Sequence, residues 1–382
     1  VSVTEGVGTT GVSVSLSTPS ARDVTVPFTV TPAGTALNPV DVSDIDMVNR
    51  QVRQYLSNNG SSAAAATVSA LTPLTLNNTT LQSQAEYGIG NNEGVVIDVF
   101  GDLYQAGDVA GQPASIRVFK NVSDRSPSQG FDPVVDKIIV GPSTGLVAPK
   151  GLDVDSTAGL LFVADFGAGN IKVFSTGAVN DAAPLGTTTL TANPWDVDYD
   201  PSADRLYVAL TDGTVAVFDS YVSGGFGATG ADRTITPFDS GVQVSVNLHG
   251  IVHNAATDEL YLSDVGAITS GANSDGQLFL IPSASTADGA RQATVIIGGA
   301  ATTLGNPVDI AFDGTNLWVA EKTNDAVLVY NDFRNAASGN VAPSASFAQT
   351  KPESIALDPG TRRDHDVVNG TLTFMPGQTA AV

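Results

Sequence analysis

Short alternating runs of apolar and polar residues, separated by turn residues, fill most of this chain. In the segment 149–175, apolar side chains alternate at 152–154 and 171–173 and run unbroken over 160–164. Alternation is typical of half-buried strands, and a short apolar run is typical of a strand buried on both faces. The Gly-rich stretch 167–170 marks a turn. The segment therefore predicts three strands joined by tight turns.

This segment is one copy of a repeat. Its first strand, which closes on Asp or Asn, recurs six times, at residues 94–98, 149–155, 194–200, 248–254, 307–313 and 352–358. Five copies are followed by an apolar second strand and an alternating third strand. Repeats of about 45 to 60 residues fit four-stranded propeller blades. The pattern predicts a six-bladed β-propeller, and the repeated motif resembles that of the NHL-like six-bladed propellers.

The sixth copy of the repeat stops after its first strand. An unfinished blade would leave unpaired strand edges and an uncovered apolar face. We therefore expect residues upstream of the first copy, 67–90, to complete it, with strand-like stretches at 74–76 and 80–87. The propeller then spans 67–360, and its two ends meet.

The segment 39–66 is predicted to be a connector. It carries apolar residues at helical spacing behind a possible N-cap, Ser43, and ahead of a stop at 58–60, which predicts a short amphipathic helix; these residues are Ile45, Val48, Val52, Tyr55 and Leu56. Such a helix either packs between two domains or lies exposed on the connector.

The two ends of the chain fit together as one further domain. Residues 1–38 contain Glu5-Gly6 and two alternating strands, and residues 361–382 contain an acidic stretch, 364–366, and a strand, 370–374. In this order the pieces resemble a Calx-β domain, an immunoglobulin-like β-sandwich, opened at a loop. Insertion into a loop is tolerated because closure entropy grows slowly with loop length. The predicted fold class is all-β, a six-bladed β-propeller inserted into a loop of a Calx-β-like sandwich.

The resemblance implies a calcium site in the sandwich. Calx-β domains bind calcium through loop carboxylates, which correspond here to Glu5 and Asp364, with Asp366 as a further oxygen donor. His365 stands where the family has Tyr. The alternative is a solvated acidic loop without a metal. The family's final strand is not evident before Val382, and this favours strand addition from another copy, giving a homopolymer.

Composition excludes several classes of partner. The net charge of −22 argues against binding to nucleic acid or to anionic membrane surfaces, because both need Lys and Arg. An acidic surface serves solubility or the binding of divalent cations. There is no Cys, so thiolate chemistry is excluded. No apolar run approaches the roughly 20 residues of a membrane span.

Candidate chemistry inside the propeller is sparse. His249 and His253 share one strand face, but no third metal ligand or catalytic Glu accompanies them, which favours a structural role. The run Asp196, Asp198 and Asp200 superficially matches a calcium loop, yet it lacks the required Gly and terminal Glu, so the repeat explains it better.

The sequence supports three functions. The first is a secreted bacterial surface protein with a structural or adhesive role, which binds protein subunits or cell-surface ligands and is not an enzyme. The second is a metal-dependent propeller hydrolase or lyase. The third is a carbohydrate-binding propeller, which requires an exposed aromatic platform at Trp195 or Trp318; both lie in blade strands, and this favours core packing.

Overall fold

The computed structural model describes residues 53–59, 91–122, 131–226, 230–267 and 274–358, together with six strands outside these ranges. Those strands are β1 (Val14–Ser15), β2 (Val24–Thr29), β4 (Thr67–Leu71), β5 (Thr79–Ser83), β29 (Asn369–Phe374) and β30 (Ala380–Ala381). The chain divides into two compact units. One comprises Val1–Gln51, Val99–Gly101 and Pro359–Val382, and the other comprises Val52–Asp98 and Asp102–Asp358.

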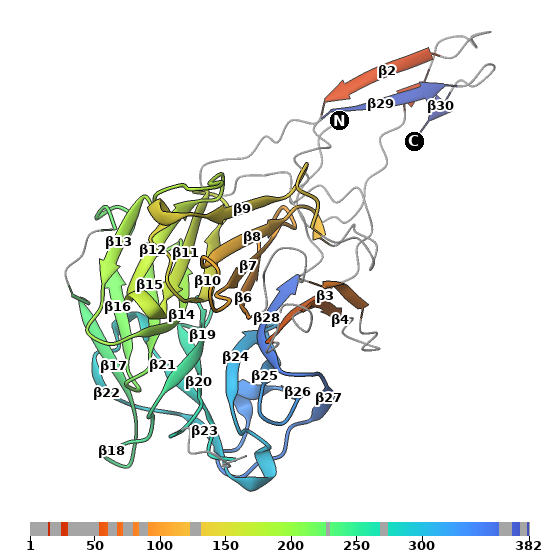
Figure 1. Cartoon of the computed structure of the whole chain (residues 1–382). Coiled ribbons are helices and arrows are strands. Elements are labelled where there is room, and N and C mark those ends of the chain that lie inside the picture. The colour runs from red at the N-terminus through yellow and green to blue at the C-terminus, as the bar shows by residue number, and fades with distance from the viewer. Residues whose placement is uncertain are drawn as a thin grey trace. The chain divides into compact units, whose positions relative to one another are not determined.

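The larger unit is built from small antiparallel sheets (Figure 1). Five of them consist of strands in sequence order. The first sheet contains β6 (Asn92–Ile97), β7 (Leu103–Gly107), β8 (Ser115–Phe119) and β9 (Lys137–Val140); the second β10 (Pro149–Asp155), β11 (Leu160–Asp165), β12 (Asn170–Ser175) and β13 (Gly186–Thr189); the third β14 (Pro194–Asp200), β15 (Arg205–Leu210), β16 (Val215–Asp219), β17 (Arg233–Asp239) and β18 (Val242–Gln243).

The fourth and fifth sheets follow the same plan. The fourth contains β19 (Leu248–Asn254), β20 (Glu259–Asp264), β21 (Gln277–Pro282) and β23 (Val295–Gly298); the fifth contains β24 (Pro307–Phe312), β25 (Leu317–Glu321), β26 (Ala326–Tyr330) and β27 (Ala345–Ala348). Five one-turn 3-10 segments lie wholly within the described residues: η5 (Pro142–Thr144), η6 (Phe166–Ala168), η7 (Ala284–Thr286), η8 (Ala300–Thr302) and η9 (Phe333–Asn335).

The sheets are arranged as a β-propeller. The first strand of each sheet contacts the first strand of the next, in the order β6, β10, β14, β19, β24 and β28 (Pro352–Asp358), and β28 in turn contacts β6. The all-β class and the propeller arrangement predicted from the sequence are thus confirmed. Five blades are formed by consecutive strands, where the repeat count predicted six, because the sixth copy supplies only the strand β28.

Strand β28 pairs with strands from near the start of the chain. It lies beside β3 (Arg53–Asn58), which pairs with β4, which pairs with β5. We call this sheet the β28 sheet. Arg53 and Asp358 are direct partners in its register, and so are Asn58 and Pro352.

The helix predicted in the connector is wrong over Arg53–Asn58, which is a strand. Tyr55 and Leu56 are fully buried, and so are the polar neighbours Gln54 and Ser57. Because both faces of this strand are covered, its apolar residues do not alternate, and their spacing matched a helix by coincidence. The expected strand at 74–76 lies outside the described residues.

The hydrophobic core lies between neighbouring sheets. Phe162 of β11 stacks on Tyr199 of β14, with ring centroids 4.5 Å apart, and the cluster around them draws on the second and third sheets. A similar cluster joins Tyr104 of β7 to Phe174 of β12. The β28 sheet is packed in the same way, because Leu56 contacts the fifth sheet and Tyr55 contacts the first.

A carboxylate at the end of the second strand anchors the loop that enters each of three sheets. Asp165 accepts the backbone N–H groups of Val147 and Ala148 at 3.0 and 2.8 Å. Asp264 and Glu321 accept N–H groups from the equivalent loops of their own sheets. This explains why the repeat has an acidic residue at this position.

Three sheets pair through the backbone of their outer strands with the next sheet along the chain. Ile139 of β9 forms a parallel bridge with Asn180, and Ile297 of β23 forms one with Gly339. Strand β17 pairs in parallel with β22 (Gly289–Gln292). In a fourth sheet the link is a side-chain bond, in which Thr188 of β13 donates its hydroxyl to the carbonyl of Phe226. In each case the residue reached lies between the third and fourth strands of the following sheet, and the backbone pairs leave fewer free edge groups on β9, β17 and β23.

The smaller unit contains two pairs of strands, each pair joining the two ends of the chain. β2 pairs antiparallel with β29, from Val24 opposite Phe374 to Thr29 opposite Asn369. β1 pairs antiparallel with β30, with Val14 opposite Ala381.

Candidate functional site: the central channel

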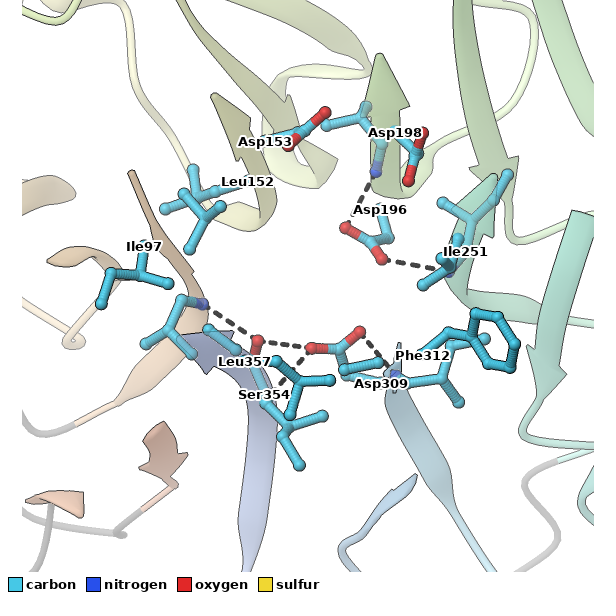
Figure 2. Close-up of a pocket in the computed structure, with 18 residues that line it drawn as sticks. Ile97, Leu152, Asp153, Asp196, Asp198, Ile251, Asp309, Phe312, Ser354 and Leu357 are labelled. Atoms are coloured by element: carbon cyan, nitrogen blue, oxygen red, sulfur yellow. Dashed lines mark hydrogen bonds between the residues drawn. The ribbon is translucent and has the colours of Figure 1, made fainter. Parts of the chain in front are cut away.

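The innermost strands of the propeller enclose a cavity of about 210 Å³. Residues from all six of these strands line it, and Figure 2 shows the side chains that face it. The channel is the place where side chains from different sheets converge, and concave sites of this kind are the usual location of ligand sites.

Four aspartates, which we call the channel aspartates, line this cavity: Asp153 on β10, Asp196 and Asp198 on β14, and Asp309 on β24. Asp196 is buried and the other three are partly buried. Ser354 on β28 lies beside Asp309 and donates its hydroxyl to it (Figure 2).

Each channel aspartate accepts a backbone N–H from the next sheet. Asp153 accepts from Tyr199 at 2.7 Å. Asp196 accepts from Ile251 at 3.1 Å, and Asp198 accepts from His253 at 3.0 Å.

Asp309 accepts from Ile355 at 2.9 Å, and the chain of contacts continues because Ser354 accepts the N–H of Val95 on β6 at 3.0 Å. Backbone N–H groups in strands usually donate to carbonyl groups of their own sheet. Here they donate to side chains of another sheet, so these bonds tie neighbouring sheets together.

The third position of each innermost strand is either glycine or a polar residue. It is Asp196, Asp309 or Ser354 in three sheets, and Gly94, Gly151 or Gly250 in the others. A Cβ atom at Gly151 would lie 2.6 Å from the Cα of Asp196, and one at Gly250 would lie 2.8 Å from the backbone nitrogen of Ile310. Glycine therefore occupies positions where the backbone of the next sheet lies too close for a Cβ atom, and at the other three positions a polar side chain accepts a hydrogen bond from the next sheet.

The channel carries negative charge without a basic partner. Among the described residues that line it, none is Lys, Arg or His. Burial raises the pKa of Asp153 and of Asp309 to about 6. Burial, together with the neighbouring carboxylates Asp309 and Asp153 respectively, raises the pKa of Asp196 and Asp198 well above the usual value.

A second group of side chains lies at the second position of the innermost strands, near the N-terminal ends of these strands. We call it the N-terminal cluster: Glu93, Lys150, Trp195, His249 and Glu353 from five innermost strands, and Lys322 after β25. Lys150 pairs with Glu93 at 2.6 Å and with Asp108 at 3.2 Å, and Lys322 pairs with Glu353 at 2.5 Å.

Trp195 is enclosed within this cluster. Its ring stacks on His249, with centroids 3.6 Å apart and planes 10° apart, and Phe166 meets its edge at 5.5 Å. The ammonium of Lys150 lies 5.4 Å from its ring centroid. Burial, with Lys322 and Lys150 nearby, lowers the pKa of His249 well below its usual value. His249 covers one face of the indole, and Lys150 and Phe166 lie close to the ring, which disfavours stacking of a sugar there.

The other residues singled out in the sequence have structural contacts. Trp318 is 6% exposed and donates its indole N–H to Asp313 at 2.9 Å, which confirms the prediction of core packing. His253 packs on Tyr207, and its two ring nitrogens lie 3.7 Å from Asp200 and Asp258. Asp200 accepts the N–H of Ser202 in the turn after β14, as the repeat predicted.

The predicted calcium ligands Glu5, Asp364 and Asp366 lie outside the described residues. Within the described part of the chain, no three His, Asp or Glu side chains are grouped so that they could hold a metal ion. No helix there is long and apolar enough to cross a membrane.

Sequence reasoning missed most of this site. Asp309 and the charged members of the N-terminal cluster were not singled out. The available signal was the column of aligned third positions, where Asp, Ser and Gly alternate in place of the apolar residues expected of a strand.

No protein-family model and no curated protein matches this chain. Solved structures do match. A chain of the nidogen/laminin complex has 15% identity and a TM-score of 0.53, over 80% of this chain and 98% of that one. The periplasmic gluconolactonase of Pseudomonas aeruginosa has 13% identity and a TM-score of 0.52, over 81% and 99%. A Bacteroides fragilis protein provisionally named a 6-phosphogluconolactonase has 12% identity and a TM-score of 0.50, over 82% and 99%.

The chain is similar to β-propellers. At these identities the similarity establishes the fold alone, because one fold supports many functions. The named activities of two of these proteins therefore say nothing, by themselves, about the channel described above.

Proposed function

We propose that this protein is a non-enzymatic structural or adhesive module of a bacterial cell surface, in which the propeller is a rigid display body. One observation carries the proposal: all four channel aspartates hold neighbouring sheets together through backbone N–H groups. A catalytic carboxylate must instead reach substrate or a metal. Each channel aspartate thus already has a structural task in holding the propeller together.

The N-terminal cluster supports the same conclusion. Lys150 and Lys322 are paired with Glu93 and Glu353, and Trp195 is stacked on His249. The two lysines and the indole are thus engaged with neighbours in the cluster. This also disfavours carbohydrate binding at Trp195, the third function that the sequence suggested.

The enzyme alternative is tested directly. The name of the Pseudomonas aeruginosa protein makes glucono-lactone the natural substrate to try, with and without added Ca²⁺, Mg²⁺, Mn²⁺ or Zn²⁺. We expect no hydrolysis above the uncatalysed rate. A rate increase that Asp309→Asn abolishes, in a protein that still folds, would replace this proposal with a propeller hydrolase.

We propose that the β28 sheet is a sixth blade that closes the ring. Its support is that β28 contacts both β24 and β6, and that Leu56 and Tyr55 pack against the fifth and first sheets. Closure by strands from both ends of a repeat removes the exposed blade face that an open ring would leave.

We further propose that the two ends of the chain form one Calx-β-like sandwich with the propeller inserted in a loop. The pairing of β2 with β29 and of β1 with β30 supports this, because each pair takes one strand from before the propeller and one from after it. Calcium at Glu5, Asp364 and Asp366 remains part of the proposal. Chelation should then lower the melting temperature of the sandwich and leave that of the propeller unchanged.

A surface module needs partners, and we propose that any assembly between copies proceeds through the sandwich. The outer edges of β9, β17 and β23 already pair with the backbone of the following sheet, which disfavours strand addition there. Electron microscopy of native cell surfaces, with antibody against the propeller, tests both location and assembly. Labelling confined to the cytoplasm would overturn the proposal.

A further inference from the structure

The channel aspartates do two things that conflict at neutral pH. They accept hydrogen bonds that hold sheets together, which favours the ionised form. They also place negative charges in a cavity of about 210 Å³ whose described lining residues include no cation, and burial of unpaired charge is costly.

The charged groups around this cavity do not relieve the conflict. β10 presents Asp153 with Asp155 two residues on, β14 presents Asp196 and Asp198 with Asp200 beyond them, and β24 presents Asp309. β6 and β28 add Glu93 and Glu353, whose partners are Lys150 and Lys322. β19 contributes backbone N–H groups to the channel, while the side chain of His253 lies near Asp200 and Asp258.

Figure 2 shows Asp196 and Asp309 pointing towards the interior of the channel from different sheets. The negative charge of Asp309 is among the causes that raise the pKa of Asp196, and Asp153 acts on Asp198 in the same way. The aspartates therefore interact as a group across the sheet boundaries that they hold together.

We propose that the central channel is an acid-strengthened lock, in which the channel aspartates take up protons on mild acidification and the sheets are then held together more firmly than at neutral pH. A protonated carboxyl keeps a lone pair for the N–H of the next sheet, and it no longer repels the carboxylates across the channel. A module that carries this lock is most stable in mildly acidic surroundings.

The sign follows from linkage. A carboxyl whose pKa in the folded protein lies above its unfolded value contributes stability that is fully present below the unfolded value and lost as pH rises through the folded one. For Asp153 and Asp309 the pKa rises from 3.8 to about 6. Each therefore contributes at most roughly a hundredfold to the unfolding equilibrium between about pH 4 and pH 7.

Other titratable residues also make the stability depend on pH, and the experiment must separate their contribution from that of the channel aspartates. Burial lowers the pKa of His249 and His253, so their contribution runs the opposite way as pH falls below about 6.5. Asp204, Asp219 and Asp313 have lowered pKa values, and their effect lies below the unfolded value of 3.8. Comparing variants of the channel aspartates with wild type removes all of these, because every variant keeps them.

Asp198→Asn is the sharpest variant. The amide oxygen can still accept the N–H of His253, so the substitution removes charge and keeps the hydrogen bond between sheets. The matched control is Asp212→Asn, at an exposed aspartate in a turn of the same sheet. Both are compared with wild type by urea unfolding, followed by tryptophan fluorescence, at about pH 7.5 and about pH 5 with chelator and constant ionic strength.

We expect Asp198→Asn to be more stable than wild type at neutral pH, and its advantage in the folding equilibrium constant to shrink by roughly tenfold or more between about pH 7.5 and pH 5, where the wild-type carboxyl takes up its proton. Asp212→Asn should keep the wild-type pH dependence. An Asp198→Asn protein whose stability runs parallel to wild type at both pH values would overturn the proposal. Asp153→Asn gives a second test. Failure of both variants to fold would also contradict the proposal, because it requires the uncharged side chain to be favoured.

Discussion

Gly151 shows how tightly single residues are constrained where two sheets meet. A Cβ atom there would lie 2.6 Å from the Cα of Asp196 in the next sheet, closer than real contacts allow. Gly151→Ala should therefore destabilise the propeller by about 1–3 kcal/mol or more, as overpacking against backbone does. The measurement is urea unfolding.

Gly177→Ala is the matched control for this substitution. Its Cβ would meet only the Ser175 hydroxyl, at an ordinary 3.4 Å. We expect a change within about 0.5 kcal/mol, typical of surface sites. Equal losses in the two variants would show that the sheets do not approach as described.

His249 should stay neutral well below the usual pKa of histidine. Burial is the main cause, with Lys322 and Lys150 adding to it. Because Trp195 stacks on this ring, protonation would change its fluorescence. In a Trp318→Phe background, where Trp195 is the remaining Trp, we expect the emission to follow the same pH profile between about pH 8 and pH 5.5 whether or not the imidazole of His249 is present.

The comparison for this measurement is His249→Gln in the same background, which defines the pH response without an imidazole. A midpoint near the ordinary value of about 6.5 that is lost in His249→Gln would mean that the imidazole is solvated.

For single residues, the sequence predicted which ones lie in turns or in the core, but not which hydrogen bonds they form between sheets. The turn aspartates and the core position of Trp318 follow from the repeat alone. The hydrogen bond from Tyr199 to Asp153 could not be predicted, because it joins positions 46 residues apart whose separation depends on how two sheets pack. The role of a charged residue on a strand face cannot be assigned until the strand that packs against it is known.

Among the elements, β3 carries the clearest test of the propeller's closure. Leu56 is fully buried against Val308, Ala311 and Trp318 of the fifth sheet. Leu56→Ala should cost about 2–5 kcal/mol, the usual range for removing a buried leucine. The loss should appear in the single unfolding transition of the propeller, measured by tryptophan fluorescence.

Leu185→Ala is the control, since Leu185 is 56% exposed. It should change stability by less than about 0.5 kcal/mol. If Leu56→Ala were equally mild, the β28 sheet would not be part of the cooperative propeller unit.

The strands that repeat in sequence were predictable, and β3 was not. Copies of one motif reinforce each other, so a weak alternation in one copy is recognised from the rest. Tyr55 and Leu56 belong to no second copy, and a strand buried on both faces gives no period of two. The prediction that residues upstream of the first copy complete the β28 sheet is therefore correct, but the predicted segment, 67–90, begins after β3.

For the whole molecule, the register of β28 predicts that the propeller can be separated from the rest. Arg53 and Asp358 are direct partners, so the two ends of the propeller segment meet within one sheet. A fragment of residues 52–358 should fold alone, with the melting temperature of the propeller transition in the full chain. Differential scanning calorimetry of both proteins measures this.

The reciprocal protein is the control: residues 1–51 joined to 359–382 by a short Gly-Ser linker. If the ends form one sandwich, this chain should fold and show the second transition. A fragment 52–358 that melts far below the full chain would mean that the propeller depends on the other unit.

The pairing of β28 with β3 also sets the order in which the chain can fold during synthesis. Asn58 donates its side-chain N–H to the carbonyl of Thr350, 292 residues later. Until that residue emerges, the first and fifth sheets each keep an apolar face uncovered, and a growing chain adds only about 5–20 residues per second. We therefore expect the unfinished chain to be cut by proteases more readily than the complete propeller, until β28 has emerged and paired with β3.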